Sequence, residues 1–158
     1  PLPDLFPKTV WPEEQLRYNS HYPHGDEIII SYSVQGRPVL ESPKLEKIGE
    51  IPVIHHRLTV HAGENPLELI VLDDQPEIKG KTATIGYSIA WLQTKNEKVR
   101  FRSSDNGKLV LQIPPSDKPL HLNVALSHDE SDSLKQQTPS HQVVNLLEWT
   151  RGLSLIHI

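Results

Sequence analysis

Histidines are the first residues to consider for chemistry, because nine of them occur in this chain of 158 residues. Imidazole nitrogens bind transition metals when the spacing brings two rings to one side of an element. His21 and His24 are three positions apart, and His55 and His56 are adjacent, so on strands each pair points to opposite faces. The chain has no H-x-H pair and no H-E-x-x-H motif. We therefore expect no histidine metal site.

Carboxylates could supply oxygen ligands instead. Asp129, Glu130 and Asp132 form an acidic loop, and clustered carboxylate oxygens suit Ca²⁺. The D-x-[DN]-x-[DN]-G pattern of a calcium loop is absent, however, and a solvated loop is the alternative. These three residues are therefore a weak calcium candidate.

Enzyme motifs are mostly missing. Without cysteine the chain has no thiolate nucleophile, disulfide, thiolate zinc site or attached c-type haem. The G-x-S-x-G elbow, the P-loop and the Rossmann fingerprint are also absent. A glycosidase would need two carboxylates facing each other across a cleft. The candidates, which the sequence cannot rank, are Glu27, Glu41, Glu68, Asp73 and Asp74. We expect no catalytic residue and no cofactor in this chain.

Aromatic rings offer a binding chemistry, because a β-sandwich can stack exposed rings on the C–H faces of a sugar. Trp11, Tyr18 and Tyr22 lie near the edge of the predicted domain and are the candidate platform. Trp91 continues the apolar alternation of Tyr87 and Ile89, which predicts that it faces the core.

The elements that must position these residues are short strands with a period of two, separated by Gly, Pro and Asn turns. This spacing predicts an all-β antiparallel sandwich of jelly-roll or immunoglobulin-like architecture over residues 13–128. Tight hairpin turns are expected at Gly25 and at Gln35–Gly36. The expected strands are Tyr18–His24, Glu27–Val34, Arg37–Glu41, Val53–Val60, Leu67–Leu72, Thr82–Gln93, Val99–Arg102, Lys108–Ile113 and Leu120–Ser127.

Four flanking segments differ from this pattern. Residues 1–12 form a Pro-rich lead-in, where four prolines block helix and central strand, and its apolar side chains could lie across the domain surface. Residues 129–141 have the polar composition of a linker. Residues 142–152 regain hydrophobicity, which predicts either the start of another domain or a segment docking back on the sandwich. Residues 153–158 resemble a translated sequencing adapter, with a short apolar strand as the alternative.

The net charge and the apolar content of the chain limit the classes of partner that we expect. The net charge of −4 argues against nucleic acid, which needs a basic surface. No apolar run approaches the roughly 20 residues of a membrane-spanning helix. The chain contains no Met, so we expect that it begins inside a longer reading frame.

Residues 17–34 and 39–43, R-Y-N-S-H-Y-P-H-G-D-E-I-I-I-S-Y-S-V and V-L-E-S-P, resemble a segment of large exported bacterial proteins. Those proteins continue into a β-propeller similar to sorbosone-type, PQQ-type dehydrogenases and often carry a c-type cytochrome domain. The ending Leu147–Gly152 also resembles that family. The resemblance implies an extracytoplasmic location, with redox chemistry in other domains, and it transfers no catalytic residue to this chain.

We therefore expect a non-catalytic accessory module whose partners are neighbouring domains of the same polypeptide. A carbohydrate-binding module is the first alternative. An enzyme that acts on glycosides through a carboxylate pair is the second.

Overall fold

Alternating apolar residues and two-residue turns build eleven strands in the computed structural model, which describes residues 16–151. The lead-in at 1–12, with Trp11, and the adapter-like residues 153–158 lie outside the described residues. The strands are β1 (Leu16–His24), β2 (Glu27–Val34), β3 (Arg37–Ile48), β4 (Ile51–Val60), β5 (Leu67–Leu72), β6 (Glu77–Lys79), β7 (Thr82–Ile85), β8 (Ser88–Thr94), β9 (Arg100–Ser103), β10 (Leu109–Ile113) and β11 (Leu120–His128). A short 3₁₀ turn, η1 (Ser133–Gln136), and one helical turn, α1 (Leu146–Trp149), follow.

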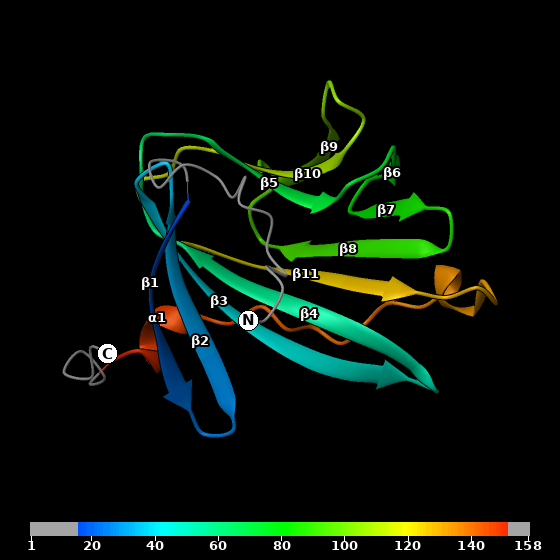
Figure 1. Cartoon of the computed structure of the whole chain (residues 1–158), viewed down its shortest axis with the longest axis horizontal. Coiled ribbons are helices and arrows are strands. Elements are labelled where there is room, and N and C mark those ends of the chain that lie inside the picture. The colour runs from blue at the N-terminus through cyan, green and yellow to red at the C-terminus, as the bar shows by residue number, and fades with distance from the viewer. Residues whose placement is uncertain (1–15, 152–158) are drawn as a thin grey trace, which may run out of the picture.

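The strands form two antiparallel sheets, so the prediction of an all-β sandwich is confirmed. The large sheet has eight strands in the order β1-β2-β3-β4-β11-β8-β7-β6, and the small sheet has three in the order β5-β10-β9. Figure 1 shows the small sheet lying over one part of the large one. The core between them is mostly aliphatic and includes Leu58, Leu111 and Leu122, all buried. No helix within residues 16–151 is long and apolar enough to cross a bilayer.

Turn chemistry sets the register of the hairpins. Gln35 and Gly36 join β2 to β3 with φ of 51° and 80°. Two successive positive φ values are typical of a type I′ turn, whose twist matches that of the paired strands. Gly25, with a φ of 64°, begins the turn between β1 and β2. Both predicted hairpins are confirmed.

Apart from shifts of one or two residues at strand ends, the structure differs from the predicted strands at three places. The predicted strand Thr82–Gln93 is divided, because Gly86 has a φ of 56° and turns the chain between β7 and β8. β3 continues beyond Glu41 to Ile48 and pairs with β4 along its whole length. β6 was not predicted.

The outer face of the large sheet is covered by residues 129–150, which we call the strap. Figure 1 shows the strap returning from the end of β11 along the sheet to α1. Leu134 and Leu146 of the strap are completely buried against that face. The sequence predicts a linker over 129–141, and the structure instead packs Leu134 of this range against the sheet. The composition is polar because many of its side chains face solvent and only a few face the sheet.

Trp91 is buried as expected, but it lies on the outer face beneath the strap. Its neighbours there are Ile89, Ala125 and Leu134. Ala90 and Leu92, which alternate with it on β8, point into the core between the sheets.

Candidate functional site

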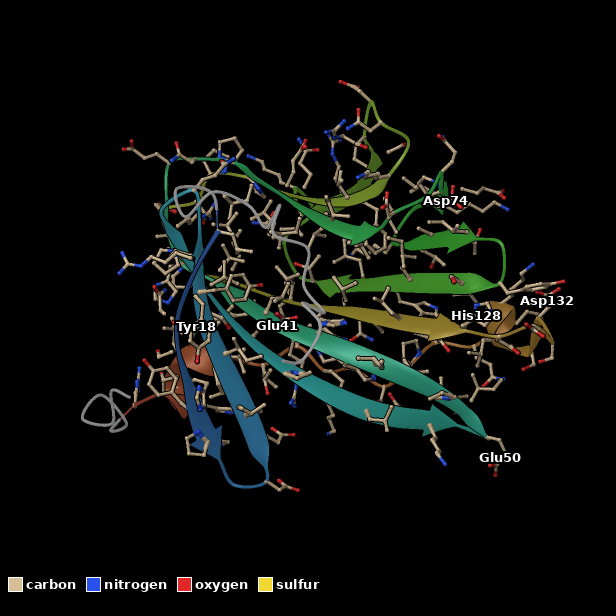
Figure 2. All side chains as sticks on the ribbon, in the orientation of Figure 1. Tyr18, Glu41, Glu50, Asp74, His128 and Asp132 are labelled. Carbon is tan, nitrogen blue, oxygen red and sulfur yellow. The ribbon has the colours of Figure 1, made fainter. Side chains whose placement is uncertain are left out.

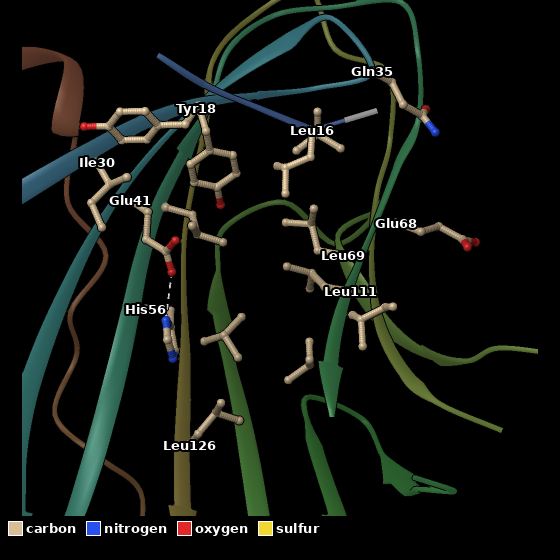
Figure 3. Close-up of a pocket in the computed structure, with 16 residues that line it drawn as sticks. Leu16, Tyr18, Ile30, Gln35, Glu41, His56, Glu68, Leu69, Leu111 and Leu126 are labelled. Carbon is tan, nitrogen blue, oxygen red and sulfur yellow. Dashed lines mark hydrogen bonds and ion pairs between the residues drawn. The ribbon is translucent and has the colours of Figure 1, made fainter. Parts of the chain in front are cut away.

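An open groove of about 640 Å³ lies between the two sheets. We call it the inter-sheet groove. The large sheet supplies one wall through β1 to β4 and β11, and the small sheet supplies the other through β5 and β10 (Figure 3). Its lining is mostly apolar and includes Leu16, Tyr18, Tyr32, Glu41, His56 and Leu69. This combination of an apolar lining and a few polar side chains is typical of binding sites.

A hydrogen-bonded pair of side chains marks the polar part of the groove. Glu41 on β3 and His56 on β4 lie 2.8 Å apart, between Oε1 and Nδ1 (Figure 3). Burial raises the pKa of the Tyr32 phenol above its ordinary value, and the charge of Glu41 and a hydrogen bond to it add to the shift. Tyr32 therefore keeps its proton at physiological pH. The groove offers hydrogen-bonding groups in an otherwise apolar setting.

The predicted aromatic platform is not brought together. β1 carries a bulge between Tyr18 and Ser20, so that Tyr18 pairs with Tyr32 and Tyr22 pairs with Ile29. An extra residue in a strand reverses the side to which later residues point. Tyr18 consequently lines the inter-sheet groove, whereas Tyr22 packs on the outer face beside Leu146. Trp11 lies outside the described residues, and carbohydrate binding stays a prediction.

The predicted calcium residues point to different partners. Both carboxylate oxygens of Asp129 accept hydrogen bonds within its own loop, among them those from the Ser131 and Leu134 amides at 3.0 and 2.9 Å. Oε1 of Glu130 lies 3.7 Å from Nε2 of His128, and Oδ1 of Asp132 lies 3.2 Å from Nζ of Lys135. Figure 2 shows His128 and Asp132 at the end of β11. Within residues 16–151, no three His, Asp or Glu side chains are grouped to hold a metal ion.

Asp129 holds the first residues of the strap in place through its hydrogen bonds, and we expect its contribution to the stability of the fold to depend on pH. Hydrogen bonds from Ser131, Leu134 and Ser133 lower the pKa of Asp129 to about 2. Because this pKa is depressed in the folded state, the stabilisation is complete above the ordinary value and is lost as the pH falls towards 2. We expect Asp129→Asn to lower the melting temperature by several degrees at pH 7. The difference from the wild type should shrink between pH 4 and pH 2, as measured by thermal unfolding across that range.

Asp132→Asn is the control for this experiment, because Asp132 is half-exposed and holds only a surface ion pair with Lys135. Equal pH profiles for Asp129→Asn and the wild type would contradict the role assigned to Asp129.

The five candidate glycosidase carboxylates are engaged separately. Glu27 pairs with Arg57 at 3.2 Å, and Asp73 pairs with Lys108 at 3.3 Å. Glu68 forms an ion pair with Arg102, and Asp74 accepts a hydrogen bond from the amide of Gln75 at 2.7 Å. Figure 2 shows Asp74 far from Glu41. Glu41 and Glu68 both line the inter-sheet groove, and each has a partner of its own, His56 for Glu41 and Arg102 for Glu68.

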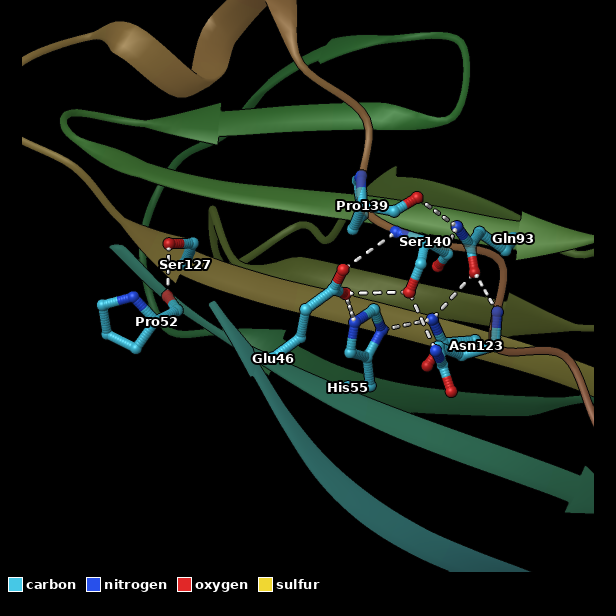
Figure 4. A network of polar contacts seen from close by, with 9 residues as sticks. Glu46, Pro52, His55, Gln93, Asn123, Ser127, Pro139 and Ser140 are labelled. Carbon is cyan, nitrogen blue, oxygen red and sulfur yellow. Dashed lines mark hydrogen bonds and ion pairs between the residues drawn. The ribbon is translucent and has the colours of Figure 1, made fainter. Parts of the chain in front are cut away.

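A buried polar network beneath the strap was not predicted. Nε2 of His55 contacts the carboxylate of Glu46 (Figure 4). Nδ1 of His55 accepts a hydrogen bond from Nδ2 of Asn123 at 2.9 Å. Asn123 also donates to Gln93, and Ser140 of the strap donates to Glu46 at 3.0 Å.

This order of contacts differs from a nucleophilic triad, in which the imidazole lies between the hydroxyl and the carboxylate. Here the Glu46 carboxylate lies between Ser140 and His55 (Figure 4). The network attaches the strap to the sheet, and the sequence signal for it is a set of polar residues at alternate positions of β4 and β11.

Residues 3–41 match the sequence model of a family described as Domain of unknown function (DUF6797). No curated protein matches this chain, and no solved structure matches it. The matched range includes the lead-in from Pro3, all of β1 and β2, and the start of β3 as far as Glu41. These strands contribute Leu16, Tyr18, Tyr32 and Glu41 to the inter-sheet groove.

Proposed function

We propose that this protein is a non-catalytic accessory module of a larger exported protein, and that its inter-sheet groove holds an apolar segment of the polypeptide. The observation that carries the proposal is the groove itself, an open space of about 640 Å³ with a mostly apolar lining. Apolar surface of this kind in water favours a partner that covers it.

The apolar outer face of the large sheet is already covered. The strap buries the outer face of the large sheet through Leu134, Leu146 and the side chains around them. The inter-sheet groove differs, because Tyr18 and Ile70 on its rim are 60% and 45% exposed. A binding partner for this protein is therefore best sought at the groove.

The polar groups of the groove suit a polypeptide partner. The Tyr32 hydroxyl and the Glu41–His56 pair can form hydrogen bonds with backbone amides and carbonyls, which an extended segment carries along its length. The exported context comes from the resemblance of residues 17–34 and 39–43 to large exported bacterial proteins.

The proposal can be tested with matched pairs of surface variants. Ile70 and Ile54 are 45% and 46% exposed, and Tyr18 and Tyr87 are 60% and 49% exposed, but only the first of each pair lines the groove. We expect Ile70→Lys and Tyr18→Ser to change the affinity for Nile red, a neutral apolar dye, by about ten-fold, since one lost apolar contact is worth roughly 1.4 kcal/mol. Ile54→Lys and Tyr87→Ser should leave it unchanged.

Each outcome of this experiment has a meaning. Weaker dye binding would show that the dye enters the groove, and stronger binding would show that the substitution displaces a segment already there. Groove variants that match their controls would contradict the proposal. An oligosaccharide that binds the wild type and Tyr87→Ser, but not Tyr18→Ser, would replace it with carbohydrate binding.

A further inference from the structure

We infer that the segment held in the inter-sheet groove is residues 3–12 of the same chain, which belong to the Pro-rich lead-in. The inference rests on the proposed function of the groove and names its occupant. It makes the groove an internal docking site that fixes how the preceding polypeptide enters the domain.

The point at which the lead-in joins β1 supports this assignment. Leu16, the first residue of β1, lines the groove, so the lead-in joins the domain at the groove itself. An extended chain of the polyproline type advances about 3.1 Å per residue. Trp11 and Phe6 precede Leu16 by five and ten residues, and chains of those lengths span at most about 15 Å and 31 Å. The apolar residues of the lead-in can reach the lining residues.

The composition of the lead-in matches the groove. Between Pro3 and Pro12 the large apolar residues occur as two pairs, Leu5–Phe6 and Val10–Trp11, and each pair is followed by a proline. Proline restricts the backbone before binding, so that an extended segment loses less conformational entropy when it docks. Grooves that bind Pro-rich segments are commonly lined by aromatic rings. Tyr18 and Tyr32 supply such rings here.

The covalent connection favours the lead-in over a separate molecule. A short tether converts binding into an intramolecular step with an effective concentration in the millimolar range. Even a weak apolar contact is then occupied for much of the time. A second copy of the chain would have to compete at its own, far lower, solution concentration.

The range of the family match covers both the lead-in and one wall of the groove. It begins at Pro3 and ends at Glu41, so it joins the lead-in to the wall of the groove built by β1, β2 and the start of β3. A unit formed by a segment and the wall that binds it accounts for these limits.

The experiment uses a spin label, and the absence of native cysteine makes the labelling specific. A nitroxide at Thr9→Cys lies between the two apolar pairs without replacing either. We expect it to broaden the methyl signals of Leu69, Val71 and Leu111, which line the groove, beyond detection in the 158-residue chain. The methyl signals of Ile48 and Ile51, which pack in the outer-face cluster of Leu134 and do not line the groove, should persist.

Two further samples complete the test. A label at Asp132→Cys, at the end of β11, should leave the groove signals intact. Phe6→Ser together with Trp11→Ser should restore most of the groove signals in the Thr9→Cys protein, because the apolar contacts of the lead-in are lost. These substitutions precede Leu16, where the described residues begin, so the described fold is expected to persist.

Three results would overturn the inference. The groove signals could remain unbroadened, they could fail to recover in the Phe6→Ser, Trp11→Ser protein, or they could broaden only when labelled protein is mixed with unlabelled, isotope-enriched protein. The last result would identify a second copy as the occupant. If the dye experiment on Ile70→Lys still succeeds in these cases, the proposed function stands with a different segment in the groove. If it also fails, both are wrong.

Discussion

Leu146→Ala is expected to lower the free energy of unfolding by about 3 kcal/mol, as is usual for the loss of a fully buried leucine side chain. Leu146 has no exposed surface and packs on Ile29 and Leu40 of the outer face. Its backbone amide also donates to Oγ1 of Thr59 at 3.1 Å. Equilibrium unfolding in urea, followed by fluorescence, measures the change.

The matched control is Leu45→Ala, because Leu45 is 63% exposed on the same large sheet. A change within about 0.5 kcal/mol is expected there. Leu134→Ala provides an independent repeat, since Leu134 packs in a different cluster with Val53, Ile89 and Trp91. If both strap variants were as stable as the control, the strap would not pack on the sheet in solution.

We expect the strap to contribute strongly to the free energy of unfolding, because it covers polar as well as apolar residues of the sheet. Arg57 is 2% exposed, donates to the carbonyl of Ser42 at 3.0 Å and has its guanidinium 5.2 Å from the Trp149 ring centroid. The Trp149 ring also stacks on the imidazole ring of His24, with 4.5 Å between the ring centroids. Without the strap these groups would face water, and the hydrogen bonds that hold them in place would be exposed to competition.

Arg37→Ala is expected to destabilise the protein by about 3–5 kcal/mol, because buried acceptors would lose charged hydrogen bonds worth about 1.5–3 kcal/mol each, with incomplete additivity. Arg37 is 3% exposed. Its guanidinium donates to the carbonyls of His61, Asn65 and Pro114 at 2.7, 2.9 and 2.8 Å. These carbonyls belong to the chain after β4 and after β10, so one side chain joins both connections to the start of β3.

Arg37→Lys should recover only part of the loss, because an ammonium group lacks the planar fork that reaches several carbonyls at once. Arg100→Ala is the control, since Arg100 is exposed and contacts the side chain of Gln112. Gly63 packs against the same guanidinium stem, and a Cβ there would lie 2.8 Å from Cδ of Arg37. Urea unfolding of the three arginine variants measures these effects, and equal stability of Arg37→Ala and Arg100→Ala would contradict this role.

Local patterns predicted the strands well, since alternation and turn residues are properties of neighbouring positions. β2 and β5 begin and end where the sequence predicts. The Gln35–Gly36 turn is another example, because two residues with positive φ specify the hairpin without help from the rest of the molecule.

The candidate platform shows where local patterns are insufficient. Tyr18 and Tyr22 are four positions apart, which on a regular strand places them on one face. The bulge after Tyr18 separates them onto opposite faces, and nothing in the composition of β1 announces it. The Glu41–His56 pair was also unpredicted as a pair, because it depends on the alignment of β3 with β4.

The sequence by itself determined the all-β class, most of the strands and the hairpin turns, because each depends on the period and the backbone preferences of adjacent residues. Only the tertiary structure decided which face each side chain meets across the sandwich. It placed Trp91 under the strap, brought residues 129–150 back onto the sheet and opened the inter-sheet groove beside β1. These features arise from contacts between residues far apart in the chain, such as Leu146 with Ile29, and a single sequence carries no local signal of such contacts.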